Sequence, residues 1–159
     1  MPAPKTMTTD PNIIKQLRGD EAVRQLPYDD ATGETLAKGM TLAGNLTIGI
    51  GRNLSADGLR PQEIDMLCAN DVQEVIDELR SRLPWFDSLD SVRQGVLINM
   101  AFNMGTADLM GWGTFLGLVK AGQYAAAAQD MAKTPWASEV GARATRLERQ
   151  MRTGAWVFA

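Results

Sequence analysis

Two carboxylates and a hydroxyl in the first third of the chain have residue types that suit hydrolysis of a glycosidic bond. Glu21 follows a predicted helix, Asp30 comes nine residues later, and Thr47 begins a β-prone run that ends at Gly51. In such a reaction one carboxylic acid protonates the leaving oxygen, while a carboxylate and a hydroxyl hold and activate water on the opposite face of the sugar. Many solvated loops carry two acids at this spacing, so the assignment depends on the rest of the chain.

The elements that position these residues differ along the chain. Asp10 and Pro11 predict the start of a helix, and Gly19 predicts its end, so that Glu21 emerges beside a helix terminus. Residues 28–58 are rich in glycine and contain short β-prone runs, which predict a small hairpin sheet. Clefts between such a lobe and a helical lobe are common ligand sites.

The chain from Pro61 onward has helical periodicity. Apolar residues three or four apart predict a long helix that Pro84 ends, and Asp90 predicts the N-cap of the next. Further helices are predicted before residue 122, over 124–132 and over 140–151. The predicted fold class is α+β: a flexible tail over 1–9, then one domain over 10–159. In it a small antiparallel β lobe, about 22–60, is inserted in a mainly helical protein, about 61–159 plus the N-terminal helix, with a cleft between the lobes.

Composition narrows the chemistry further. The sequence has no histidine, which excludes Ser-His-Asp and Cys-His nucleophile systems and imidazole-held metals. Cys68 is the single cysteine and lies on the apolar stripe of a predicted helix, so we expect it to pack in the core. Among the catalytic systems considered, the composition therefore favours one based on carboxylates.

Charge and hydropathy bear on partners. The net charge of −3 argues against nonspecific nucleic-acid binding, which needs a basic surface. The sequence has no apolar run of about 18 residues that would predict a transmembrane helix, and its first residues lack the apolar region of a signal peptide. We therefore expect the product to remain in the compartment where it is made, without stable membrane insertion.

Several segments in the same order resemble the phage-type lysozymes, the family of T4 lysozyme-like endolysins. The resemblance begins with Leu17–Glu21, Tyr28, Asp30 and Thr47–Gly51. It continues through 70–72, 87–93, 98–105, 132–136, 143–146 and 152–156, and so covers about residues 13–156.

The resemblance implies a lysozyme-like α+β fold. It also implies an inverting muramidase that hydrolyses the β-1,4 bond between N-acetylmuramic acid and N-acetylglucosamine in peptidoglycan. It implies that Glu21 is the general acid, that Asp30 and Thr47 position and activate the water, and that no metal or organic cofactor is needed. Inversion predicts that the two carboxyl groups lie about 6.5–9.5 Å apart.

Two departures from the family pattern affect this assignment. Residues 31–46, sixteen in all, separate Asp30 from Thr47, whereas the family spacer is much shorter. A longer hairpin accounts for this, because lengthening a loop costs little entropy. The insertion also contains Thr32, Thr35 and Thr41; Thr47 is preferred because Ile-Gly-Ile-Gly follows it directly.

The second departure is Arg52, which stands where the family pattern carries histidine. It predicts a charge pair between Arg52 and Asp71 that joins the lobes.

Other positions carry expectations from the same resemblance. Asn103 and Arg143 are expected to contact substrate, with Arg143 facing Glu21, and Asp20 is expected to pair with Arg146. Trp112 is expected to contact substrate for another reason, because glycines flank it beside the predicted cleft. A guanidinium beside Glu21 would lower the pKa of the general acid, so burial must offset it or the arginine serves mainly to orient. Asp29 is expected to lie on the surface.

The implied protein is a monomeric phage endolysin that acts on peptidoglycan glycan strands. It would be made in the host cytoplasm, reach the cell wall through a holin-type protein and lyse the bacterium. Three alternatives remain open, one of which is the catalytic part of a tail-associated lysin or bacteriocin. A lytic transglycosylase would leave 1,6-anhydro ends without using water, and an inactive wall-binding or virion module would cleave nothing.

Overall fold

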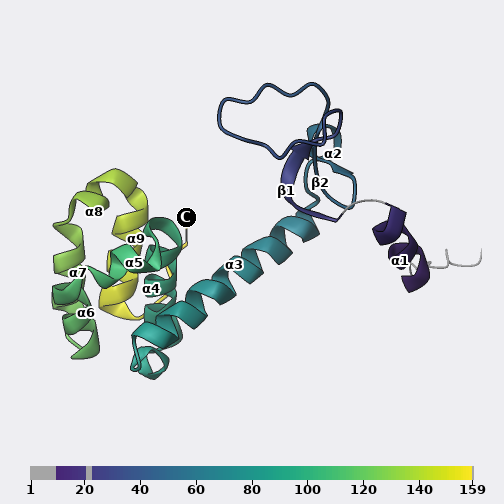
Figure 1. Cartoon of the computed structure of the whole chain (residues 1–159). Coiled ribbons are helices and arrows are strands. Elements are labelled where there is room, and N and C mark those ends of the chain that lie inside the picture. Colours follow the sequence, from purple (N-terminus) through teal and green to yellow (C-terminus); the bar gives the residue numbers. More distant parts are fainter. Residues whose placement is uncertain (1–9, 21–22, 159) are drawn as a thin grey trace, which may run out of the picture. The chain divides into compact units, whose positions relative to one another are not determined.

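The computed structural model describes residues 10–20 and 23–158, which form a mainly helical α+β protein with a small antiparallel sheet near its N-terminus. The predicted fold class is confirmed at this level. The chain divides into two compact units, residues 1–64 and 65–159, with the boundary inside one long helix. Figure 1 shows the helices and strands. Among the described residues, no helix is long and apolar enough to cross a membrane.

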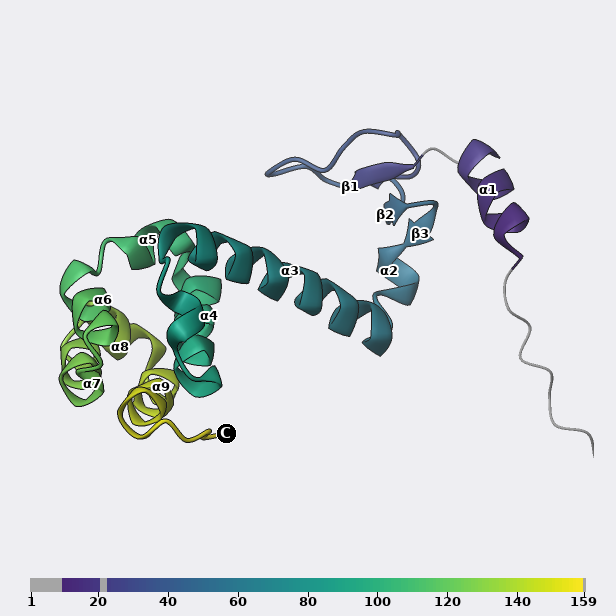
Figure 2. The same ribbon diagram turned by 90° about the horizontal axis from the view of Figure 1, so that it is seen from below.

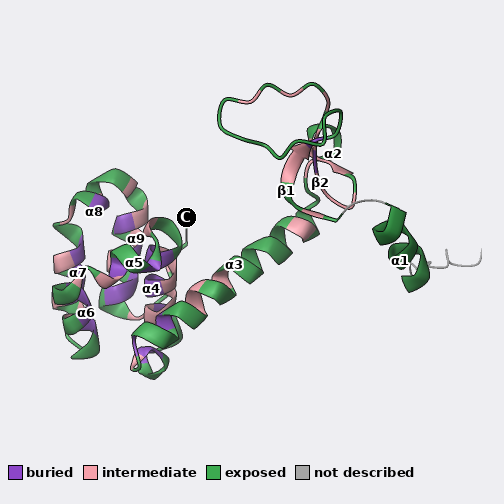
Figure 3. Cartoon of the chain, viewed as in Figure 1, coloured by how far each residue is buried: buried purple, intermediate pink, exposed green. Residues whose placement is uncertain are grey.

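The first helix is α1, Pro11–Asp20, which begins where the sequence predicted. The Asp10 carboxylate accepts a hydrogen bond from the backbone N–H of Asn12 at 2.9 Å, so it caps an otherwise unsatisfied donor. The helix continues through Gly19 rather than ending there. Its apolar residues Ile13, Ile14 and Leu17 are exposed, as Figure 3 shows along the whole helix.

The sheet contains β1 (Arg24–Asp29), β2 (Leu46–Gly49) and β3 (Arg52–Asn53) in the order β1-β2-β3, with both pairs antiparallel. The β2–β3 turn contains two glycines with φ of 69°, Gly49 and Gly51. Other L-residues rarely adopt this conformation, so these glycines serve backbone geometry. The Asn53 side chain then caps the short helix α2, Leu54–Asp57.

The long helix α3, Pro61–Arg82, has the predicted extent, but its apolar stripe is buried only toward its end. Leu79 is buried and Val75 and Ile76 pack against the helical core, whereas Leu67 and Cys68 are exposed. The prediction that Cys68 lies in the core is therefore wrong. Helical periodicity identifies an apolar face, but it does not tell how much of that face has a partner.

The second unit holds the apolar core of the described residues. After a short 3-10 helix, Phe86–Ser88, it contains α4 (Ser91–Met104), α5 (Thr106–Met110), α6 (Gly113–Lys120), α7 (Tyr124–Ala132), α8 (Pro135–Val140) and α9 (Ala142–Thr153). Helix α9 packs against α4, α7 and α8, an arrangement visible in Figure 2. Leu97, Met100, Phe115 and Met131 are completely or almost completely buried at the centre.

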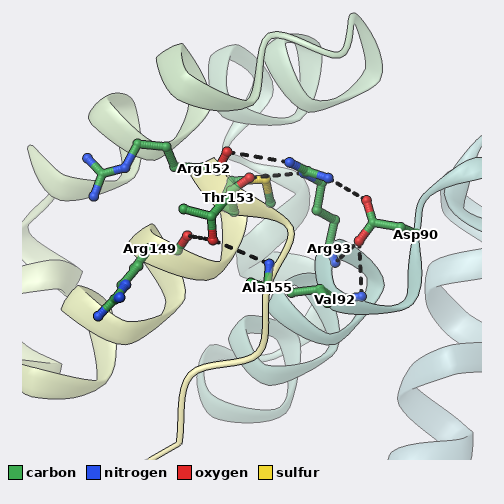
Figure 4. Close-up of polar contacts among 8 residues, drawn as sticks. Asp90, Val92, Arg93, Arg149, Arg152, Thr153 and Ala155 are labelled. Atoms are coloured by element: carbon green, nitrogen blue, oxygen red, sulfur yellow. Dashed lines mark hydrogen bonds and ion pairs between the residues drawn. The ribbon is translucent and has the colours of Figure 1, made fainter.

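An arginine joins the two ends of this helical unit. Asp90 caps α4 as predicted, accepting from the N–H groups of Val92 and Arg93. The Arg93 guanidinium pairs with Asp90, donates to the Met151 carbonyl at 2.9 Å, and lies 3.6 Å from the centroid of the Tyr124 ring. Figure 4 shows how Arg93 connects the start of α4 with the end of α9.

Candidate active site

The proposed general acid, Glu21, lies outside the described residues, so the separation between the two carboxyl groups stays a prediction. Its neighbour Asp20 is the last residue of α1 and is exposed. The expected pair between Asp20 and Arg146 likewise stays a prediction.

Asp30 is an exposed residue, and both oxygens of its carboxylate accept hydrogen bonds from one residue, Asn45. Oδ1 accepts from the Asn45 backbone N–H at 2.7 Å, and Oδ2 accepts from the Asn45 Nδ2 at 3.0 Å. These two hydrogen bonds, the backbone one first, hold the pKa of Asp30 below its ordinary value of 3.8. Asp30 is therefore ionised at neutral pH, with lone pairs on both oxygens left for a water molecule.

Thr47 lies in the central strand and is only 3% exposed. It is the register partner of Tyr28 on β1 and of Asn53 on β3, so these three side chains share one face of the sheet. Its hydroxyl oxygen is 3.4 Å from the Asn45 carbonyl oxygen, a long hydrogen bond in which the hydroxyl donates. Asn45 thus connects Asp30 to Thr47.

Sequence reasoning missed Asn45. Its position two residues before Thr47, at the entry to a strand, was a usable signal, because asparagine side chains commonly bond nearby backbone and turn groups. The sequence did not indicate which residue Asn45 would bond, because its partner Asp30 is fifteen residues away.

The insertion is a loop closed at its neck. The backbone N–H of Asp30 donates to the Asn45 carbonyl at 3.0 Å, directly after the pairing of Asp29 with Leu46. Inside the loop Thr32 accepts from the Glu34 N–H, and Thr35 accepts from Arg24. Of the four candidate threonines, Thr47 is the one whose described contacts share a partner with Asp30, which favours its selection.

Asp29 is buried, so the expectation that it lies on the surface is wrong. Its carboxylate accepts three backbone N–H bonds, from Ala43 at 2.5 Å, Ala31 at 2.9 Å and Gly44 at 3.0 Å. The Ala43 bond is the largest cause of a pKa for Asp29 below its ordinary value. Closure of the loop surrounds this carboxylate with backbone donors, and no local feature of the sequence shows that.

The expected pair between Arg52 and Asp71 would join the two units and stays a prediction. Within the first unit Arg52 pairs with Glu63. Its guanidinium lies 3.1 Å from Glu63 and donates twice to the Gly58 carbonyl, at 2.8 and 3.0 Å. The turn after α2 and the first turn of α3 supply these acceptors close to Arg52 in the sequence. Asp71 lies farther along α3, where it lines a hollow in the second unit together with Glu74 and Glu78.

Trp112 and Asn103, both expected to contact substrate, are connected through Trp136 in the second unit. The Trp136 indole N–H donates to Asn103 Oδ1 at 2.7 Å, and the ring of Trp112 meets that of Trp136 edge-on at 5.7 Å. Trp112 borders two hollows of about 320 and 510 Å³. The second also contains the carboxylates Asp108 and Glu139, so it offers an aromatic wall with polar acceptors, a combination that suits a sugar or peptide.

Arg143 is half-buried and oriented by α4. Its Nε donates to Asn99 Oδ1 at 2.7 Å and one terminal nitrogen donates to the Asn99 carbonyl at 3.2 Å. Arg143 and Arg146 line a hollow of about 240 Å³ together with Trp156 and Phe158. The expectation that Arg143 faces Glu21 stays a prediction, because Glu21 is not described.

Among residues 10–20 and 23–158, no cluster of three or more histidine, cysteine or acidic side chains could hold a metal ion. A comparison of the sequence with protein-family models finds no match.

Proposed function

We propose that the protein is an inverting muramidase that hydrolyses the β-1,4 bond between N-acetylmuramic acid and N-acetylglucosamine in peptidoglycan. The observation that carries the proposal is the contact of Asn45 with both Asp30 and Thr47 at the neck of the loop. Two residues selected for one reaction, and separated by sixteen others, share this single partner.

In the proposed reaction Glu21 donates its proton to the glycosidic oxygen as the bond from that oxygen to the anomeric carbon breaks. Water forms the new bond to the anomeric carbon from the opposite face and releases a proton to Asp30. The two Asn45 donors keep Asp30 ionised, which also stabilises the positive charge that develops on the sugar. A lowered pKa makes Asp30 a weak base, so proton transfer to it follows bond formation.

Thr47 takes the smaller part in this scheme. Because it is nearly buried and its hydroxyl donates to Asn45, its effect on the water runs mainly through the position of Asn45. The same burial supports a second candidate function, a lytic transglycosylase, in which no water need be held and the product carries a 1,6-anhydro end.

The biological role that accompanies the main proposal is that of a phage endolysin. It would act on the glycan strands of the bacterial wall after release from the host cytoplasm by a holin-type protein. The aromatic hollows beside Trp112 are suited to contact the polymer.

Digestion of purified Gram-negative peptidoglycan tests the proposal, with the new chain ends identified by mass spectrometry for wild type, Glu21→Gln and Asp30→Asn. Reducing N-acetylmuramic acid ends from the wild type alone support the muramidase. Anhydro ends would replace it with the transglycosylase. A correctly folded wild type that binds the polymer and cleaves nothing would leave an inactive wall-binding module.

A further inference from the structure

The residue preceding the proposed catalytic carboxylate is the least expected feature of the first unit. Asp29 is 0% exposed, yet the described contacts of its carboxylate are with backbone N–H groups and include no cation. The three donors, Ala31, Ala43 and Gly44, come from both ends of the loop. One side chain therefore holds the two ends of the loop together.

These ends are also the surroundings of Asp30. Ala31 follows Asp30 directly, and Gly44 precedes Asn45, whose two donors bind the Asp30 carboxylate. Fixing Ala31 and Gly44 to one carboxylate thus fixes the backbone from which Asp30 and Asn45 project.

Gly44 fits the same arrangement. A Cβ at this position would overlap Asp30 Oδ1 and would lie 2.8 Å from the Ala31 Cβ and 2.9 Å from the Ala31 nitrogen. No side chain can occupy this place unless Asp30 or Ala31 moves, so the approach of the two loop ends requires glycine here.

We propose that Asp29 is a positioning residue which, together with Gly44, holds the Asp30 carboxylate against Asn45. The inference rests on the proposed function, in which Asp30 holds the attacking water. Asp29 itself is buried and touches no substrate. Its role is to keep Asp30 in the orientation that the reaction needs.

The pH dependence of the reaction separates positioning from a simple effect of charge. The negative charge of Asp29 raises the pKa of Asp30, so its removal alone should shift the acid limb of the profile to lower pH. If Asp29 positions Asp30 instead, Asp29→Asn releases Asp30 from the Asn45 donors. The pKa of Asp30 then rises toward its ordinary value, and the acid limb moves to higher pH.

The experiment measures kcat, KM and the pH profile of kcat/KM on peptidoglycan fragments for the full chain and four variants. For Asp29→Asn and Gly44→Ala we expect kcat to fall roughly 10–100-fold, with KM within about twofold, because a small misplacement of a catalytic group is costly. Both variants should move the acid limb upward. Gly44→Ala changes no charge, so its shift can come only from geometry.

Two matched variants serve as controls. Glu34→Gln removes an exposed carboxylate from the same loop, and Gly117→Ala adds a Cβ in α6 where it meets no atom within 4 Å. Both should keep wild-type kinetics. An acid limb that stays in place or moves downward in Asp29→Asn, or a Gly44→Ala variant that behaves as wild type, overturns the proposal.

A second readout does not need activity. Titration of the Asp30 carboxyl carbon by NMR, assigned with Asp30→Asn, should show a higher pKa in Gly44→Ala than in wild type. If wild type cleaves no glycan, the proposed function fails, and this titration still decides whether the loop neck positions Asp30. If circular dichroism shows that Asp29→Asn does not fold, the Gly44→Ala variant decides both the pH profile and the NMR titration.

Discussion

Different interactions stabilise the interior of each of the two units. In the described part of the first unit the two buried side chains are polar, Asp29 and Thr47, and the loop is closed by hydrogen bonds from backbone to carboxylate. In the second unit leucine, methionine, phenylalanine and valine side chains form an apolar core. The comparison teaches that the proposed chemistry lies where orientation is specified by polar contacts, and that most of the hydrophobic stabilisation lies elsewhere.

The largest effect should come from Asp30→Asn, which separates activity from stability. Loss of the carboxylate should lower kcat by about 10²–10⁴-fold, the usual contribution of a catalytic acid or base. The melting temperature should change little, since Asp30 is exposed. Asp57→Asn, an exposed carboxylate in α2, is the control. Equal activity of the two variants would remove Asp30 from the site.

Phe115→Ala, in the second unit, should lower stability rather than act directly on the proposed chemistry. The ring is 0% exposed and packs edge-on to Trp112, so its loss should lower the free energy of unfolding by about 3–5 kcal/mol. Urea denaturation followed by tryptophan fluorescence measures the change. The NMR signals of the Ala31, Ala43 and Gly44 amides should stay in place. Their displacement would show that the polar neck depends on the apolar core.

Arg93→Ala should cost less, about 1.5–3 kcal/mol, because a partly buried guanidinium bonded to the Met151 carbonyl is lost. Arg152→Ala provides the comparison: that guanidinium is half exposed and pairs with Glu148 across one helical turn, so about 0–1 kcal/mol is expected. Thermal unfolding of both variants checks the order. A similar loss in both would mean that the Arg93 contacts add little.

The smallest effect should be a loss of stability in the first unit as the pH is lowered. The pKa of Asp29 is lowered in the folded chain, so its contribution to stability is present above the unfolded value near 3.8 and is lost as the pH falls through the lowered pKa. The amide signals of Ala31, Ala43 and Gly44 should therefore change in acid before those of Leu97 and Phe115. A single transition shared by both sets would contradict independent behaviour of the two units.

Features set by neighbouring residues were predictable from the sequence. Asp10 and Asp90 were expected at helix starts, and both bond N–H groups two or three residues away. The extent of α3 followed from Pro61, Pro84 and the apolar spacing. These predictions succeed because capping and periodicity depend on a few adjacent positions.

Features set by loop closure or by the extent of packing were not predictable. The burial of Asp29 depends on Ala43 and Gly44, which approach it only after the loop has closed. Cys68 belongs to an apolar stripe whose first half is exposed. Helix α3 carries several acidic residues, and spacing alone did not indicate that Glu63 in its first turn would pair with Arg52. The resemblance predicts that Asp30 and Thr47 act together, but it does not indicate Asn45, which bonds to both.

The closed neck also bears on how the loop can change. Because Asp29, Asp30, Gly44 and Asn45 fasten its two ends, the residues between 32 and 42 need not hold the carboxylate in place. Their length and sequence are free to vary by substitution, insertion or deletion while the neck is retained. The loop is thus a natural position for grafting a foreign recognition peptide without rebuilding the proposed reaction centre.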